Sequence, residues 1–255
     1  CQTYKTYYGI TRQQLERGLE KKTYRLDLSF QNLEALPENL KAFKALRMLN
    51  LSGNPKIDLQ KAVDVLVLLP ELKVLILDSM QLNKLPENFY KLRQLNHLSL
   101  ASNPGLDFSD AFEKIASFSI EFLNLSHNQL KELPENLAEI KQIRDLKLSD
   151  NRLQAHQALL VLSDLPNLRS LWLDFNGLNQ LPAEIATLGQ LRYLYLDANN
   201  LEELPEAMSG MKRLLVMHAT QNRFTELPGV LTRMQSLMFV QEVFYFFRQI
   251  TTLKI

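Results

Sequence analysis

The chain has little cysteine, glycine or tryptophan, and it lacks long hydrophobic runs. Its 255 residues contain one cysteine, one tryptophan and eight glycines. A single cysteine allows neither an intramolecular disulfide nor a cysteine-rich zinc site. The few glycines form no glycine-rich phosphate loop. The longest nearly apolar run, residues 65–70, is far shorter than the roughly 20 residues that span a bilayer.

An excess of charge of one sign is also missing. The chain has 29 basic and 28 acidic residues, for a net charge of +1. Nucleic-acid-binding proteins usually carry a concentrated basic excess, so we expect no nucleic-acid partner. Hydrophobic residues make up 46% of the chain, which is enough for a large core and argues against disorder.

The sequence repeats itself along most of its length. The segment Leu-Asn-Leu-Ser-His-Asn-Gln-Leu-Lys-Glu-Leu-Pro, residues 123–134, recurs with small changes about every 23 to 26 residues. We take the Asn of Leu-x-Leu-x-x-Asn as a marker, and Gln31 and Met80 occupy its place in two copies. The marker asparagines are Asn54, Asn103, Asn128, Asn151, Asn176, Asn199 and Asn222.

The repeating unit L-x-x-L-x-L-x-x-N-x-L-x-x-L-P resembles the leucine-rich repeat family, in the short Leu-Pro form found in bacterial proteins. The resemblance covers residues 24–237 in about nine copies. It implies an α/β fold, a right-handed solenoid or horseshoe with a parallel sheet on its concave side. It also implies a binding scaffold rather than an enzyme.

The physics of the repeat leads to the same fold. In Leu-x-Leu the two leucines point to one side, as in a short strand. One copy cannot bury its leucines alone, whereas stacked copies bury them together. We expect the marker amide to bond backbone groups of its own and the neighbouring coil, because a buried amide needs partners. Met80 has no amide, so we expect a looser third copy.

Two classes of copy alternate along the first six. Short copies carry Leu-Pro, as at residues 85–86, 133–134 and 181–182, and predict extended or 3₁₀ returns. Longer copies have apolar residues at helical spacing and predict α-helices within residues 58–69, 108–117 and 154–163. Ser109 is the predicted N-cap of the second of these helices.

Both ends of a solenoid need caps, because its terminal coils expose leucines. Residues 1–9 read as a tether, and residues 10–23 as an N-terminal capping helix. Residues 238–255 lose the repeat pattern and are rich in Phe and Tyr. Two interpretations of this segment stay open, an aromatic cap or a contact surface for another domain, a second copy or a membrane.

Large side chains gather on the predicted concave face over the last three copies. Aromatic residues of this kind often dominate binding interfaces. The alternative is that aromatic residues favour strands and merely pack on one another. The predicted ligand-binding residues are Trp172, Asp174, Phe175, Tyr193, Tyr195, Asp197 and His218. A weaker apolar patch comprises Met48, Val74 and Ile76.

The carboxylates of Asp174 and Asp197 would favour a ligand with a basic group. Catalytic and metal sites have no comparable signal. His97 and His127 lie on adjacent copies but in different columns, with no third ligand placed beside them. We therefore predict no catalytic residue, no metal and no cofactor.

A first residue Cys1 followed by a short polar tether resembles a mature bacterial lipoprotein, in which that cysteine carries the lipid. The competing interpretation is an arbitrary fragment boundary. The lipoprotein reading predicts a location in the bacterial cell envelope, with membrane contact only through the lipid on Cys1. The alternative location is the cytoplasm.

Together these features predict a non-enzymatic scaffold that binds a protein or peptide on the concave face of its solenoid. The alternative is a structural element that dimerises or docks another domain through the aromatic C-terminal segment. The sequence specifies no oligomeric state.

Overall fold

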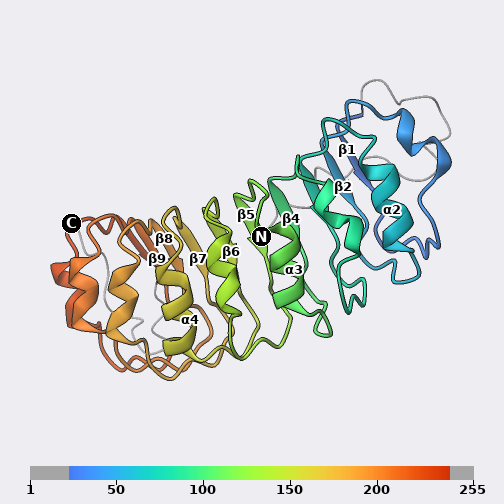
Figure 1. Ribbon diagram of the computed structural model, residues 1–255. Helices are drawn as coiled ribbons and strands as arrows, with labels where there is room; N and C mark the ends of the chain where they lie inside the picture. Colours follow the sequence, from blue (N-terminus) through green and yellow to red (C-terminus); the bar gives the residue numbers. More distant parts are fainter. Residues whose placement is uncertain (1–22, 242–255) are drawn as a thin grey trace. The chain divides into compact units, whose positions relative to one another are not determined.

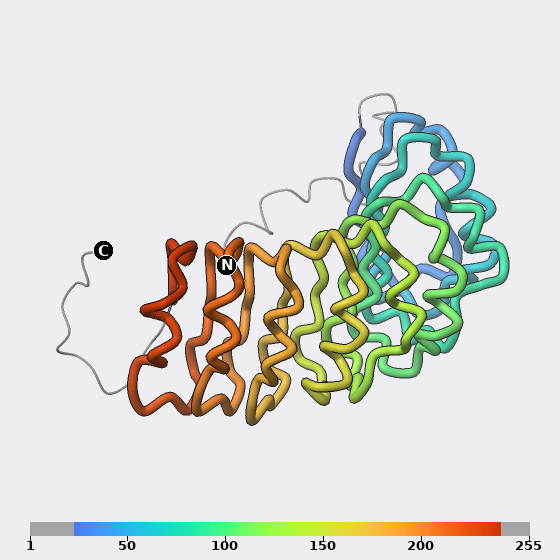
Figure 2. Tube along the Cα trace, turned by 60° about the vertical axis from the view of Figure 1, so that its left-hand side comes forward, coloured from blue at the N-terminus to red at the C-terminus, as the bar shows by residue number. Residues whose placement is uncertain are grey.

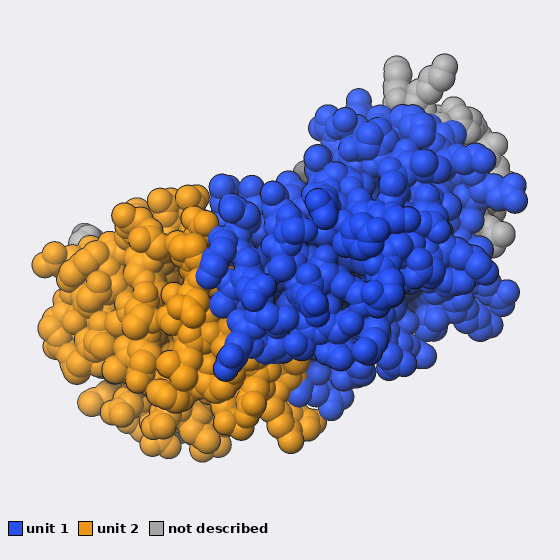
Figure 3. Space-filling model, viewed as in Figure 1, with its two compact units in different colours: residues 1–129, 134–147 blue, residues 130–133, 148–255 orange. Residues whose placement is uncertain are grey.

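The computed structural model describes residues 23–241. The chain divides into two compact units (Figure 3). Unit 1 comprises residues 1–129 and 134–147, and unit 2 comprises residues 130–133 and 148–255. Cys1, the predicted tether, nearly all of the predicted capping helix and residues 242–255 lie outside the described residues, so the predictions for them stay predictions.

Every strand within residues 23–241 is three residues long, and the strands of each unit follow one another in chain order. All the register pairs found within the units are parallel, for example Leu26 with Leu49, and Leu171 with Leu194. Unit 1 contains β1 (Arg25–Asp27), β2 (Met48–Asn50), β3 (Val74–Ile76), β4 (His97–Ser99), β5 (Phe122–Asn124) and β6 (Asp145–Lys147). Unit 2 contains β7 (Ser170–Trp172), β8 (Tyr193–Tyr195), β9 (Val216–His218) and β10 (Phe239–Gln241).

The returns between strands are of the two predicted kinds, and they lie on the side of each coil away from the strands (Figure 1). Among the described residues, the long copies return through α2 (Leu59–Leu66), α3 (Phe108–Ile115) and α4 (Ala155–Ser163). The short copies return through the 3₁₀ helices η2 (Glu38–Ala42), η3 (Glu87–Lys91), η4 (Glu135–Glu139), η5 (Ala183–Thr187), η6 (Glu206–Gly210) and η7 (Gly229–Arg233). Figure 2 shows the resulting succession of similar coils in chain order. The predicted repeat solenoid with a parallel sheet and mixed returns is confirmed.

The N-cap prediction for α3 was wrong. The helix begins at Phe108, two residues earlier than a Ser109 cap requires, and the cap is Asp107. The Asp107 carboxylate accepts the backbone N–H of Asp110 at 3.1 Å. Asp58 caps α2 in the same way, through the N–H of Lys61. In both helices the capping Asp directly precedes a buried apolar residue, Leu59 or Phe108.

The core is a stack of leucines from successive coils. The central residue of each strand points inward, and Leu49, Leu75 and Leu98 have no exposed surface. The first and third residues of the strands remain on the other side, where most are only partly buried. Because one side of the sheet is consumed by the core, the side chains available to a ligand are those on the opposite side, called here the strand face.

The marker asparagines make the bonds expected of a ladder. The Asn54 amide donates to the carbonyls of Leu28 and Leu51 at 2.9 and 2.8 Å. Its Oδ1 accepts the N–H groups of Gln31 and Leu33. Each amide thus joins its own coil to the preceding one.

At the third copy Met80 replaces the asparagine and is 2% exposed. Its backbone N–H donates to Asn103 Oδ1 at 3.0 Å. The amide of the following copy therefore holds the backbone where the third copy has no amide of its own.

The residue before each marker position adopts the left-handed conformation in all nine copies. This φ is easiest for glycine, yet only Gly53 is a glycine, and two of the nine residues are phenylalanines, Phe30 and Phe175. A bulky residue held in this conformation needs support from its surroundings. The Phe175 N–H donates to the Asp197 carbonyl at 2.9 Å, so pairing between coils supplies that support.

Candidate binding surface

The strand face of unit 2 contains a continuous row of rings, called here the aromatic column. Its members are Trp172, Tyr195, His218 and Phe239, one from each of β7 to β10. Trp172 and Tyr195 stack with their ring centroids 4.9 Å apart and their planes 2° from parallel. Tyr195 and His218 are also 4.9 Å apart, and His218 and Phe239 are 5.7 Å apart, both with tilted rings. Parallel register aligns Trp172, Tyr195 and His218, the third residues of their strands. Phe239 is the first residue of β10 and pairs with Val216, so it meets His218 diagonally.

Two rings of this surface reach solvent most clearly. Tyr193, the first residue of β8, is 37% exposed, and Phe239 is 49% exposed. Trp172, Tyr195 and His218 are half-buried. Phe239 was not predicted to lie on this surface, because residues 238–255 were expected to form a cap or tail. The sign that it missed is the spacing, since Phe239 lies 23 residues after Val216, its register partner.

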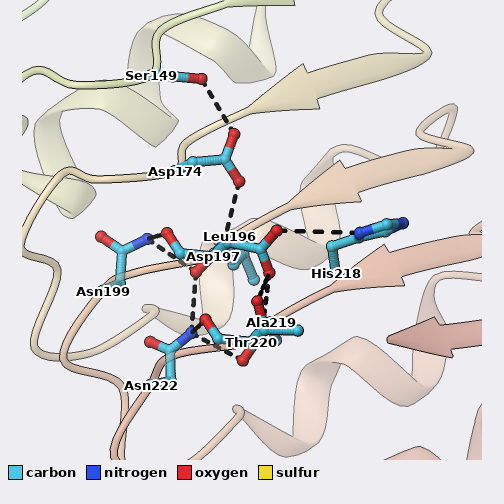
Figure 4. A network of polar contacts seen from close by, with 9 residues as sticks. All are labelled: Ser149, Asp174, Leu196, Asp197, Asn199, His218, Ala219, Thr220 and Asn222. Atoms are coloured by element: carbon cyan, nitrogen blue, oxygen red, sulfur yellow. Dashed lines mark hydrogen bonds and ion pairs between the residues drawn. The ribbon is translucent and has the colours of Figure 1, made fainter. Parts of the chain in front are cut away.

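The predicted acidic pair lies beside the column, where its oxygens are engaged within the sheet (Figure 4). Asp174 accepts the Ser149 hydroxyl at 3.0 Å and the Asp197 backbone N–H at 3.1 Å. Asp197 Oδ1 accepts the N–H and the hydroxyl of Thr220 at 2.6 and 2.8 Å. Its Oδ2 lies 3.9 Å from Nδ1 of His218. These carboxylates therefore tie neighbouring coils together.

The surroundings of the Asp174 carboxyl also disfavour its charged form. Its burial raises its pKa above the ordinary value, and the nearby charge of Asp197 acts in the same direction. The hydrogen bonds from Ser149 and the Asp197 N–H oppose this effect. Asp174 is thus poorly placed to offer a free negative charge to a ligand.

Phe175 occupies a different position from the other predicted residues. It is 58% exposed, and it lies in the left-handed turn after β7 rather than in the strand. The structure brings together six of the seven predicted residues on β7, β8 and β9 and just after their ends. It places Phe175 at the margin.

The family follows from comparison with known proteins. A family model described as a leucine-rich repeat region matches residues 123–253, just over half of the chain. The chain belongs to the leucine-rich repeat family. Among curated proteins, none matches the sequence.

Solved leucine-rich repeat structures share the fold. A leucine-rich repeat protein of Leptospira interrogans is 28% identical, with a TM-score of 0.69 over 91% of this chain and 57% of its own. The chain therefore spans little more than half of that protein. The Toll–Spätzle complex of Drosophila matches at 22% identity and TM-score 0.66, over 92% of this chain and 34% of that one. Internalin C2 of Listeria monocytogenes matches at 19% and 0.52, over 92% and 84%. The last two matches show the fold alone.

Two arginines at the start of the strands of unit 2 were not among the predicted site residues. Arg169 and Arg192 immediately precede β7 and β8, and both are exposed. The Arg192 N–H donates to the Arg169 carbonyl at 2.7 Å, so the two residues are direct neighbours. The missed signal is their shared place in the repeat, one residue before the strand.

The weaker patch of Met48, Val74 and Ile76 lies on the strand face of unit 1. All three side chains are partly buried, and the register pairs Met48 with Val74. Further along the same face, His97 and Phe122 stack with centroids 5.6 Å apart. Within residues 23–241 no group of three or more metal-ligating side chains is present. In that range no helix is long and apolar enough to cross a membrane.

Proposed function

We propose that the strand face of unit 2 binds a protein or peptide ligand, with Trp172, Tyr193 and Tyr195 as its main apolar contacts. Leucine-rich repeat folds generally serve as protein-interaction scaffolds, and structures with this fold are typically non-enzymatic. The similar Toll structure is itself a complex with Spätzle. The proposal extends this general role to one surface of this chain.

The observation that carries the proposal is the aromatic column together with exposed Tyr193. Rings that stack on one another are held in place before a ligand arrives, so binding costs little side-chain entropy. Aromatic residues supply a large contact area for few rotatable bonds. A rigid row of rings at solvent-accessible positions therefore favours recognition over simple strand packing.

The test is capture of the ligand from the native source by the immobilised chain. The double variant Trp172→Ala and Tyr195→Ala should lose the captured ligand. Tyr193→Ser, at an exposed position, should weaken capture without changing thermal stability. A matched control removes exposed aromatic rings from unit 1, as Tyr24→Ala and Tyr90→Ala. Equal capture by the wild type and the double variant would show that the face is wrongly assigned.

A second candidate function, assembly through the C-terminal segment, is favoured by one observation. Met238 is 78% exposed beside exposed Phe239 at the last described strand. Because β10 pairs with β9, a clean test keeps the strand and replaces the two exposed side chains, as Met238→Ser with Phe239→Ser. Loss of a dimer in sedimentation measurements would support assembly, and an unchanged monomer would contradict it.

A further inference from the structure

We propose that the ligand of this surface is acidic, an extended peptide segment whose Asp or Glu side chains pair with Arg169 and Arg192 while its apolar groups contact the aromatic column. The inference rests on the proposed function and specifies the partner's chemistry. It reverses the sequence-based expectation of a basic ligand.

The first support is the pair of arginines. Arg169 and Arg192 lie on neighbouring chain segments, about 4.8 Å apart by strand spacing. Within residues 23–241, neither guanidinium has a hydrogen bond or an ion pair. Like charges side by side are unfavourable, and a carboxylate that binds both arginines would relieve the repulsion. Guanidinium groups suit this task because they bind carboxylates through two parallel hydrogen bonds.

Unit 1 offers an internal comparison. The residues one position before β5 and β6 are Glu121 and Arg144, the same place in the repeat. They form an ion pair with Arg144 Nη1 3.3 Å from Glu121 Oε2. Glu121 and Arg144 thus neutralise each other, whereas before β7 and β8 both positions are arginine. Arg47 and Lys73, before β2 and β3, are also both basic, and the Arg47 guanidinium lies 5.4 Å from the centroid of the Tyr24 ring. Before β7 and β8 the counter-charge is then left to a ligand.

The second support is the engagement of the carboxylates at the other end of the strands. Asp174 and Asp197 together accept five contacts from Ser149, Thr220, His218 and the Asp197 backbone. They are partly buried, whereas Arg169 and Arg192 are exposed. A ligand could pair with the arginines without breaking existing hydrogen bonds, whereas pairing with the carboxylates would disrupt contacts between coils. The surface therefore favours a negatively charged ligand.

The third support is the orientation of the rings. A cation is attracted to the face of an aromatic ring, whereas the ring edge carries partial positive charge. Trp172 and Tyr195 cover each other's faces, and His218 stands against Tyr195 from the next strand. With its faces covered, Tyr195 presents its edge, which favours oxygen atoms of a ligand over a Lys or Arg side chain.

Trp172 is the only tryptophan, so its fluorescence reports directly on this surface. The probes are two 12-residue peptides that contain no aromatic residue, three repeats of Glu-Ser-Glu-Leu and three repeats of Lys-Ser-Lys-Leu. We expect the Glu peptide to change Trp172 emission saturably, with an affinity at least about tenfold above that of the Lys peptide. The difference should narrow as salt rises from about 20 to about 300 mM, because screening weakens exposed ion pairs.

Charge-changing variants locate the effect. The double variant Arg169→Ala and Arg192→Ala should lose at least about tenfold in affinity for the Glu peptide. Arg169→Glu with Arg192→Glu should reverse the preference toward the Lys peptide. The matched control, Arg152→Ala with Arg223→Ala, removes the same charge from exposed positions after the marker asparagines, beyond the opposite ends of the strands. It should bind like the wild type.

Three results would overturn the proposal: tighter binding of the Lys peptide, equal losses in the test and control variants, or tighter binding of a single-stranded oligonucleotide than of the Glu peptide. Failure of this inference is distinguishable from failure of the proposed function. If the Trp172 and Tyr195 variant loses its captured ligand while the arginine variants keep it, the surface binds a ligand but does not recognise acidic side chains.

Discussion

The backbone N–H of Asp197 donates to the Asp174 carboxylate at 3.1 Å. This contact joins two aspartates of successive coils on the strand face, and it places their charges near each other. Two residues that resemble a ligand-steering pair in the sequence are thereby part of the framework that holds the coils in register. Their chemistry should consequently be visible in stability rather than in ligand choice.

The first prediction concerns the pH dependence of stability. Because burial raises the pKa of Asp174, the native state holds this proton more tightly than the unfolded chain, where Asp titrates near pH 3.9. The stability that Asp174 contributes is present below that pH and is lost as pH rises through the native pKa. In urea unfolding between pH 3 and 7, the wild type should lose stability relative to Asp174→Asn as the pH increases.

Asp58 serves as a control, because its contribution to stability should change with pH in the opposite direction. The Lys61 backbone N–H lowers the pKa of this N-cap carboxylate. Its contribution is therefore present above the unfolded pKa and is lost as pH falls through the native pKa. The wild type should lose stability relative to Asp58→Asn on acidification below about pH 4. If the stability difference between wild type and Asp174→Asn changed with pH in the same direction as that between wild type and Asp58→Asn, the pKa of Asp174 would not be raised by burial.

The second prediction tests the asparagine ladder. The buried Asn176 amide donates to the Leu148 and Leu173 carbonyls, and its Oδ1 accepts the Leu153 N–H. Asn176→Ala leaves these groups without their partner, which should cost about 2 to 4 kcal/mol of unfolding free energy. Asn200, with one exposed bond to the Gly177 carbonyl, is the control, and Asn200→Ala should change stability by less than about 0.5 kcal/mol. Comparable losses in both would contradict a structural ladder.

The third prediction concerns the corrected cap of α3. Asp107→Ala removes the acceptor for the Asp110 N–H and should destabilise the protein by about 1 kcal/mol. Ser109 is exposed in the first turn of the helix, so Ser109→Ala should be nearly neutral. Thermal unfolding of the two variants distinguishes these assignments, and a larger effect at Ser109 would restore the sequence-based cap.

Much of the fold followed from local pattern. The spacing of Leu-x-Leu located the strands, and each of the six prolines six residues after the marker stands at the N-cap of a 3₁₀ helix. These features repeat because every coil must bury its leucines and form hydrogen bonds with its buried backbone groups. The single wrong cap shows the limit of local reasoning, since Asp107 and Ser109 are both good cap residues and only the start of the helix separates them.

For the candidate surface, the sequence by itself determined which large side chains point away from the core, because alternation along a strand does not depend on neighbours. Only the tertiary structure decided what those side chains do. It stacked Trp172 on Tyr195, engaged Asp174 and Asp197 inside the sheet, and set Arg169 beside Arg192 with no counter-charge from the described part of the chain. The physical reason is that these partners lie one coil away, so their pairing depends on the register between coils and on competition among side chains that no single repeat contains.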